Sequence, residues 1–344
     1  MVTDANVYWL PNELFSNQKL MDQFIRSIRH NDGVYVYTKK MDNDSIQFVI
    51  EEPKGYESLN YMEKDYDFKK QLEDMDNAHI DYAIMKLPGC QKWLDLDLCI
   101  QFNDGMAKCM KESNGRMKAL AVIPPVGGEE VFRELDRCIH KLHMHGVQLS
   151  SHYGNKYLDD PIFRPVLRKI HELNVPVYVH HSPVPVEYKS IAGYNNLRRS
   201  YGRCIDQTIA VGRELFSGMF EELPNLKMIH SMLGGGIFAF TNSWFPKHSG
   251  NGRFNTNTEK IKNYLKNNIY FEVSHAQPWG KAQLECAVKV LGAEKIIYGS
   301  SYPVKSEWLT DGPAFVNQLG ISQEEKDLIL WKNAQEIYQF ENRG

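Results

Sequence analysis

The sequence predicts an α/β protein, a single domain over residues 1–344 that forms a closed (β/α)8 barrel with an insertion after the first strand and a C-terminal helix. Two observations predict this fold. Short apolar runs rich in Val, Ile and Tyr recur along the chain, and longer stretches with apolar residues at helical spacing lie between them. This alternation is typical of parallel strands connected by helices, and eight such strands close into a barrel.

Each predicted strand is a short run with β-branched or aromatic residues, as expected of a strand buried on both faces. Helices on the outside of the barrel should then cover these strands. The predicted strands are Val2–Tyr8, Asp81–Leu87, Met117–Ile123, Gly146–Ser151, Val175–His180, Leu226–Ser231, Ile269–Ser274 and Lys295–Ser300.

The predicted helices carry apolar residues at a spacing that keeps one face against a sheet. In the first, Leu98, Phe102 and Met106 recur every four residues. A terminal helix over Gln323–Phe340 is expected to cover the barrel exterior. The other helices are Leu94–Glu112, Glu129–Met144, Pro161–Leu173, Arg203–Leu223 and Trp279–Leu291.

The stretch from Pro11 to about Tyr66 follows no alternation of strands and helices and is rich in charge and Tyr. We interpret it as an insertion above the first strand, at about residues 11–66. Its position favours a lid or a dimer contact.

The composition is that of an ordinary globular protein, with 42% hydrophobic residues, 24% charged residues and a net charge of −3. It indicates no nucleic-acid partner. No apolar run approaches the roughly 20 residues that span a bilayer, and the N-terminal MVTDANVYWLPNELF lacks a basic segment followed by an apolar one. We therefore expect no membrane partner and a cytoplasmic location. The six cysteines form no CxxC pair, so we expect reduced and mostly buried thiols.

In a (β/α)8 barrel the active site is built at the C-terminal ends of the strands. Four of these ends carry histidine in a chain that has 12 histidines. A single histidine there is more simply explained by packing or hydrogen bonding, but the cluster favours a shared site. The candidate residues at the strand ends are Asn6, Tyr8, Trp9, His152, His180, His181, His230, Met232, His275, Ser301 and Tyr302.

The order of the motifs resembles the amidohydrolase-related family that contains aminocarboxymuconate semialdehyde decarboxylase and the resorcylate and hydroxybenzoate decarboxylases. The resemblance runs nearly from end to end. It implies a (β/α)8 (TIM) barrel, carbon–carbon lyase activity and a homodimer. The segments that carry it are DANVYWLP, GVQLSSHYGNKYLDDPIFRPVLRKIHELNVPVYVHHSP, PNLKMIHSMLGGGIF, IIYGSSYP and EEKDLILWKNAQEIYQF.

The sequence departs from this family at the metal-binding positions. Where the family has Asp-x-His-x-His, the two histidine positions hold Asn6 and Tyr8. The fifth-strand histidine is retained as His180. The histidine that precedes the glycine pair after the sixth strand is replaced by Met232, and the aspartate of Gly-Ser-Asp-Tyr-Pro is replaced by Ser301.

These replacements predict that the protein binds no catalytic metal and no other cofactor. A catalytic zinc site needs about three imidazole, carboxylate or thiolate ligands, and one histidine is not enough. A relocated site from His180, His181, His230 and His275 is the alternative. Alternation along the strand would point the adjacent His180 and His181 to opposite faces, whereas His230 and Met232 would share a face. A structural zinc or a copper bound by histidine and Met232 also stays open.

Without a metal-bound hydroxide, water is hard to activate, which disfavours amide hydrolysis. Proton transfer remains available. We predict His180 as general base or acid and Tyr8 as a donor to a developing oxyanion, with His230 and His275 as further catalytic candidates. The predicted substrate-binding residues are Asn6, Trp9, His152, His181, Met232, Ser301 and Tyr302.

Aromatic and basic residues add two weaker signals. Trp9 and Tyr302 would provide a flat wall for a ring, although core packing explains them as well. Arg198, Arg199 and Arg203 would bind a carboxylate, or they simply belong to a solvated loop and helix start.

The leading functional prediction is a metal-independent lyase that decarboxylates, hydrates or dehydrates a small aromatic or unsaturated carboxylated molecule. The second is a metal-dependent hydrolase or decarboxylase with reassigned ligands. The third is a noncatalytic family member that binds a small molecule in the old pocket.

Overall fold

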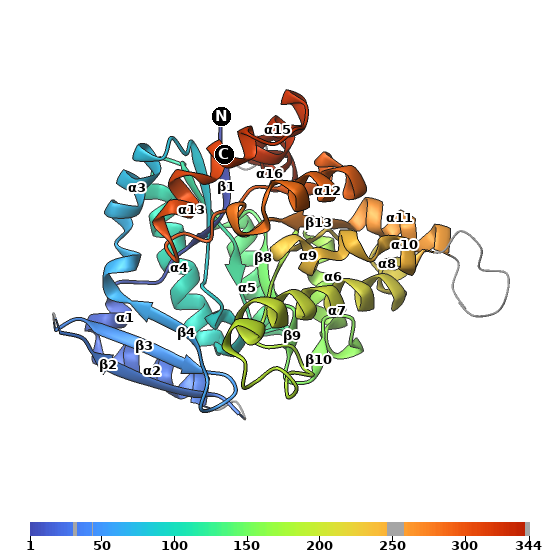
Figure 1. Ribbon diagram of the computed structural model, residues 1–344. Coiled ribbons are helices and arrows are strands. Elements are labelled where there is room, and N and C mark those ends of the chain that lie inside the picture. Colours follow the sequence, from blue (N-terminus) through green and yellow to red (C-terminus); the bar gives the residue numbers. More distant parts are fainter. Residues whose placement is uncertain (30–32, 43, 246–257, 341–344) are drawn as a thin grey trace.

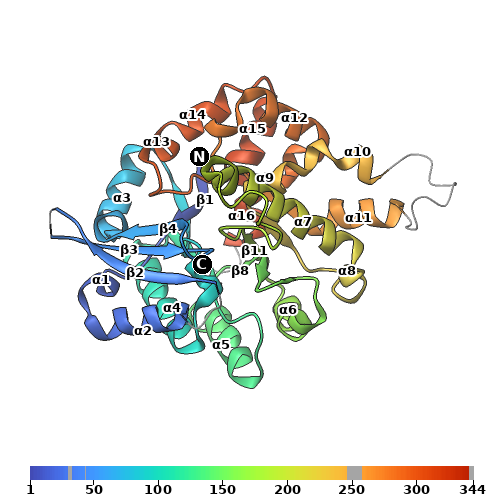
Figure 2. The same cartoon turned by 60° about the horizontal axis from the view of Figure 1, so that its bottom comes forward.

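The protein forms the predicted barrel of parallel strands in a computed structural model that describes residues 1–29, 33–42, 44–245 and 258–340. Figure 2 shows helices arranged in a ring around the strands. The barrel strands are β1 (Thr3–Tyr8), β5 (Tyr82–Lys86), β6 (Met117–Ala119) with β7 (Ala121–Val122), β8 (Val147–Ser150), β11 (Val177–His180), β12 (Met228–His230), β13 (Ile269–Glu272) and β14 (Ile296–Ile297).

The strands pair as two parallel sheets, in the orders β1-β5-β6 and β14-β13-β12-β11-β8-β7. The sheets meet at Leu120, the single residue between β6 and β7 in the third predicted strand. At the other edge, the Ala5 amide donates to the carbonyl of Tyr298 (3.0 Å) and Val7 forms a parallel bridge with Tyr302. These contacts join the eighth strand to the first and complete the ring.

The helices between the strands lie close to their predicted positions. The predicted helix Arg203–Leu223 is interrupted at Gly218, whose positive φ (80°) ends α7 and starts α8. The principal helices are α3 (Phe68–Asn77), α4 (Leu96–Glu112), α5 (Glu129–His140), α6 (Arg164–Glu172), α7 (Gly202–Phe216), α8 (Met219–Glu222), α11 (Thr258–Asn268) and α12 (Lys281–Leu291).

Shorter elements shape the loops around the barrel. A small hairpin of β9 (His152–Tyr153) and β10 (Lys156–Tyr157) follows the fourth barrel strand. The short helices are α9 (Met232–Gly236), α10 (Thr241–Trp244), α13 (Ser306–Thr310) and α14 (Gly312–Asn317). The single turns are Glu63–Tyr66, Cys90–Trp93, Pro161–Phe163, Leu197–Tyr201, Ile237–Ala239, Gln277–Trp279 and Ala293–Lys295.

The C-terminal helix closes one end of the barrel, whereas the sequence predicts a helix that covers the barrel exterior. It consists of α15 (Gln323–Asp327), a π-turn at Leu328–Lys332 and α16 (Asn333–Ile337). Ala334 and Tyr338 pack in one buried cluster with Ile84, Tyr178 and Ile229 of the barrel strands. This packing plugs the end at which the strands begin and leaves the opposite end for a site.

The insertion between β1 and β5 has secondary structure of its own. Helices α1 (Glu13–Ser16) and α2 (Gln18–Arg29) precede an antiparallel sheet of β2 (Tyr35–Lys40), β3 (Ile46–Glu51) and β4 (Glu57–Met62). The ring of Phe48 contacts Phe15 and Phe24 at centroid distances of 5.5 and 5.3 Å. This aromatic cluster packs α1 and α2 on the small sheet, and Phe24 also stacks on Phe102 of α4 at a centroid distance of 6.3 Å. The insertion thus lies against the barrel as a separate layer (Figure 1).

The remaining sequence predictions concern thiols and membranes. Four of the six cysteines are buried and all six are free thiols, as predicted. No helix within the described ranges is long and apolar enough to cross a membrane.

The glycine-rich turn after β12 generates a prediction. A Cβ at Gly235 would lie 1.8 Å from the Cys204 carbonyl oxygen of α7, at a backbone φ of +72°. Gly235→Ala should therefore lower the free energy of unfolding by about 2 kcal/mol or more, the range of overpacking costs, measured by urea denaturation. Gly193→Ala is the control, since a Cβ there meets nothing within 4 Å. Equal stability of both variants would contradict the close approach.

Candidate active site

A cavity of about 310 Å³ opens at the C-terminal ends of the barrel strands. The insertion provides one wall, because Leu59 and Tyr61 of β4 line the cavity. Six predicted site residues also line it: Tyr8, His180, His181, Met232, His275 and Ser301. The barrel therefore brings residues from the first, fifth, sixth, seventh and eighth strands to one place.

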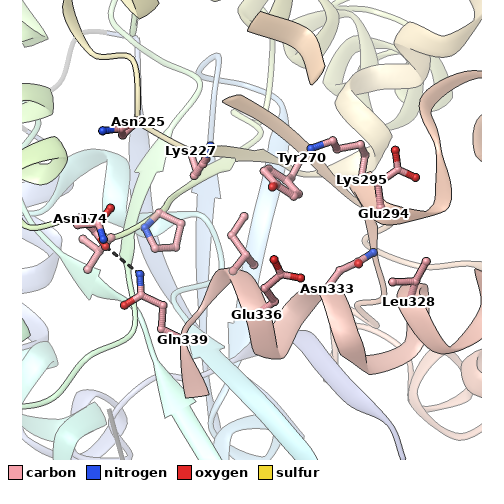
Figure 3. A pocket seen from close by; sticks show the side chains of 13 residues that line it. Asn174, Asn225, Lys227, Tyr270, Glu294, Lys295, Leu328, Asn333, Glu336 and Gln339 are labelled. Atoms are coloured by element: carbon pink, nitrogen blue, oxygen red, sulfur yellow. Dashed lines mark hydrogen bonds between the residues drawn. The ribbon is translucent and has the colours of Figure 1, made fainter. Parts of the chain in front are cut away.

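A second cavity, of about 400 Å³, lies at the opposite end of the barrel (Figure 3). Its walls come from residues that precede β11, β12 and β14 and from the C-terminal helix. Its amide side chains bond to the protein: Gln339 donates to the Asn174 carbonyl (3.0 Å), and Asn333 donates to two backbone carbonyls. Barrel enzymes place their chemistry at the other end, so the smaller cavity is the candidate active site.

A hydrogen bond between Tyr8 and His180 lies at the centre of the site. Nδ1 of His180 is 2.7 Å from the carbonyl oxygen of His181, which can only accept, so Nδ1 carries the proton. Nε2 is then an acceptor, and the Tyr8 hydroxyl, 3.0 Å away, donates to it. Burial lowers the pKa of His180 to about 3 and raises the pKa of Tyr8 to about 12. Both groups are neutral at pH 7.

Two more histidines line the cavity in neutral form. The His181 ring stacks on that of His180 at 4.3 Å, and burial holds its pKa well below the usual range. The His275 ring stacks on Trp308 at 4.2 Å, and burial lowers its pKa to about 4. The expected opposite orientation of His180 and His181 is not observed, because β11 ends at His180 and the alternation of side chains ends with it.

Asn6 lies below the cavity and orients Ser301. Its amide nitrogen donates to the Ser301 hydroxyl (3.0 Å) and to a carboxylate oxygen of Glu272 (3.1 Å). The same Glu272 oxygen accepts a hydrogen bond from Tyr178 (2.7 Å), and Ser301 donates to the Ser274 carbonyl (2.7 Å). Asn6 thus supports the cavity floor without lining the cavity itself.

Lys86 is a buried ionisable residue of this floor that the sequence did not identify as a candidate. Its Nζ lies 3.1 Å from the centroid of the Tyr178 ring and has no hydrogen-bond partner among the described residues. Burial lowers the pKa of Lys86 to about 7, opposed by the negative charges of Glu272 and Asp4. A lysine at the end of an apolar strand has no distinctive sequence signal, and only the closed barrel shows that it points inward.

Arg203, at the start of α7, lines the cavity together with Arg199. Its Nη2 donates to the Ser58 carbonyl of β4 (3.1 Å), and its buried Nε has no partner among the described residues. Arg198 lies outside the cavity lining and holds the neighbouring loop through Ala192 and Asn195. Two of the three suggested arginines therefore reach the site.

Besides Asn6, three more predicted substrate-binding residues lie outside the cavity. Trp9 packs edge-on against Phe102 of α4. Tyr302 turns away and donates to Asp74 of α3. Both ring nitrogens of His152 face backbone carbonyls of the following loops. Packing and loop hydrogen bonds thus explain their positions, and the structure corrects their assignment to the substrate pocket.

His230 also lies outside the cavity, which corrects its assignment as a catalytic candidate. It points outward from β12, where Nδ1 meets Gln207 and Nε2 meets Glu214, each at 2.8 Å. Met232 does reach the cavity because it adopts a positive φ of 52° after the strand has ended. The two residues therefore do not share a face as expected.

The chain is similar to a known protein family. A family model described as amidohydrolase matches residues 60–340, more than half of the chain. The chain belongs to the amidohydrolase family. Its resemblance to decarboxylases of this family, inferred from the sequence motifs, is thereby confirmed.

Two decarboxylases are similar in sequence. A 2-amino-3-carboxymuconate-6-semialdehyde decarboxylase of Dictyostelium discoideum is 28% identical over 246 residues, 70% of this chain and 66% of that protein. A γ-resorcylate decarboxylase of a Polaromonas species is 24% identical over 260 residues, 69% of this chain and 74% of that protein. The chain thus spans just under two thirds of the Dictyostelium protein.

A solved amidohydrolase shares the fold and contains a metal. The 5-carboxyvanillate decarboxylase of Novosphingobium aromaticivorans, complexed with manganese and 4-hydroxy-3-methoxy-5-nitrobenzoic acid, superimposes with a TM-score of 0.73 at 20% identity. The comparison covers 98% of this chain and 95% of that protein. It supports the barrel fold and raises the question of whether the present residues fit a metal ion.

The residues at the expected metal positions do not fit such an ion. The lone pair of Nε2 of His180 accepts from Tyr8, and the Asn6 amide and Ser301 hydroxyl bond to protein groups. The thioether of Met232 favours soft metals over manganese or zinc. Within the described part of the chain, no three His, Cys, Asp or Glu side chains converge as a metal site. The relocated histidine site fails in particular because His230 points to α7.

The buried contact of His230 with Glu214 generates a second prediction. Removal of one partner leaves the other buried without compensation, which costs about 3–5 kcal/mol. His230→Ala should lower the free energy of unfolding by this amount in urea denaturation. The exposed His140 provides the matched control, since surface substitutions change stability by about 0.5 kcal/mol or less. If His230→Ala kept full stability but lost activity, His230 would belong to the catalytic site after all.

Proposed function

We propose that this protein is a metal-independent lyase of the amidohydrolase family, most simply a decarboxylase, for a small aromatic or unsaturated carboxylated substrate. The observation that carries the proposal is the neutral Tyr8–His180 pair at the cavity. Its hydrogen bond uses the imidazole lone pair for proton transfer, so the ring has none left for a metal. The decarboxylase activity of the two similar proteins supports the reaction class.

The pair provides a path for one proton. A substrate hydroxyl next to Tyr8 gives its proton to the phenol oxygen while Tyr8 passes its own proton to Nε2 of His180. The proton then returns to the ring carbon of the substrate that bears the carboxylate. This protonation breaks the aromaticity of the ring. Loss of CO2 then returns the electron pair of the broken C–C bond to the ring. A bound anion stabilises the transient imidazolium, because opposite charge raises the low pKa of a buried histidine.

The cavity walls suit a flat substrate. Trp308, Tyr61 and Tyr66 line it together with Pro88 and Pro278, and a volume of about 310 Å³ is at the small end of ligand sites. Aromatic walls favour a ring or a conjugated chain. Ser301, oriented by Asn6, is placed to bond to a polar group of that substrate.

The proposal predicts that metal chelation leaves activity unchanged. Protein dialysed against EDTA should keep its turnover of a responsive substrate, found by measuring CO2 release from 2,6-dihydroxybenzoate, 5-carboxyvanillate and related acids. Elemental analysis should find less than stoichiometric metal. Activity that appears only after manganese or zinc is added would support the metal-dependent alternative with reassigned ligands.

The Tyr8–His180 pair predicts a second kinetic result. His180→Asn and Tyr8→Phe should each lower kcat by about 10²- to 10⁴-fold, the usual contribution of general acid–base catalysis. The double variant should lose little more than His180→Asn alone, since the two residues move the same proton. Tyr37→Phe, on the exterior of β2, is the matched control. Ligand binding without any turnover, in the natural sequence as in the variants, would favour the noncatalytic alternative.

A further inference from the structure

Arg203 carries a positive charge that the protein does not compensate. No carboxylate of the described residues forms an ion pair with it, and its one hydrogen bond among these residues goes to the neutral carbonyl of Ser58. Burial, then the nearby charge of Arg199, lowers the pKa of Arg203 to about 10, so it stays charged at pH 7. Buried charges in proteins are normally paired.

The cavity around Arg203 contains no group of opposite charge. No Asp or Glu side chain from the described residues lines it, and burial keeps His180, His181 and His275 neutral at pH 7. Arg203 lines the same cavity as Tyr8 and the three histidines, and its positive charge lowers the pKa values of all four. The missing counter-charge is thus a property of the cavity as a whole.

The chemistry of decarboxylation limits which anion Arg203 can bind. A carboxylate that leaves as CO2 loses its charge, so a strong ion pair with it would stabilise the ground state more than the transition state and slow the reaction. An anion that stays on the product keeps the ion pair throughout. An arginine therefore contributes best by binding a second, retained carboxylate.

We propose that Arg203, assisted by Arg199, binds a retained carboxylate and makes the enzyme specific for dicarboxylated substrates. This inference rests on the proposed function in one respect: the carboxylate that Arg203 does not bind is the one that leaves as CO2. The guanidinium also holds β4 through Ser58, so the same residue links the insertion to the bound anion. The buried Nε has no hydrogen-bond partner among the described residues, and a carboxylate is the anion that a guanidinium binds through two parallel hydrogen bonds.

Binding of unreactive probes tests this proposal without turnover. Isothermal titration in EDTA compares isophthalate, a dicarboxylate, with benzoate and the neutral isophthalamide. The natural sequence should bind isophthalate and benzoate, each of which can place one carboxylate on Arg203, at least tenfold more tightly than isophthalamide. Equal affinity for isophthalate and isophthalamide would overturn the proposal, whatever the behaviour of any variant.

Variants then assign the effect to Arg203. Arg203→Met should remove the tenfold preference for isophthalate over isophthalamide, and Arg203→Lys should reduce it severalfold while keeping the charge and the fold. Arg213→Met, on the same helix but paired with Asp159 outside the cavity, should keep the preference. An unchanged preference in Arg203→Lys and Arg203→Met would overturn the assignment. If the probes do not bind, the anion site is refuted and the metal-free mechanism stays intact. If the preference is retained but no substrate is turned over, only the proposed lyase function is refuted.

Discussion

The hydrogen bond from Tyr8 to Nε2 of His180 is the constraint on which the chemistry of this site depends. A neutral imidazole has one lone pair, and the carbonyl of His181 fixes which nitrogen carries it. A metal ion would have to displace Tyr8 to bind this lone pair. The neighbouring positions would then offer the ion an amide, a hydroxyl and a thioether as ligands. We therefore propose that the pair turns a metal-binding position of the family into a site for proton transfer between neutral groups.

The floor of the barrel shows how the buried charges are arranged without a divalent ion. Burial raises the pKa values of Glu272 and Asp4, that of Asp4 to about 6, and both carboxylates retain hydrogen bonds. Lys86 lies on the face of Tyr178, whose hydroxyl donates to Glu272. A cation, an aromatic ring and a carboxylate thus form one connected group below the cavity, and its charges offset one another within the protein.

The barrel could be predicted from sequence because alternation and helical spacing persist along the whole chain, whereas the site could be predicted only in part. The same rule of alternation failed where strands end: His180 and His181 share the cavity, and the positive φ of Met232 separates it from His230. Arg203 resembled any arginine at a helix start, because only the fold shows that its surroundings lack a carboxylate.

The two levels of the barrel differ in how their charges are balanced. On the floor, Lys86 faces acidic groups of the protein itself, so the floor has no need of a ligand. In the cavity above it, Arg203 and Arg199 face neutral histidines and aromatic rings. In the function that we propose, these arginines supply the positive charge of the cavity that also contains Tyr8 and His180. We therefore propose that anion recognition and proton transfer fall to different residues of one cavity, which the charge of Arg203 couples to each other.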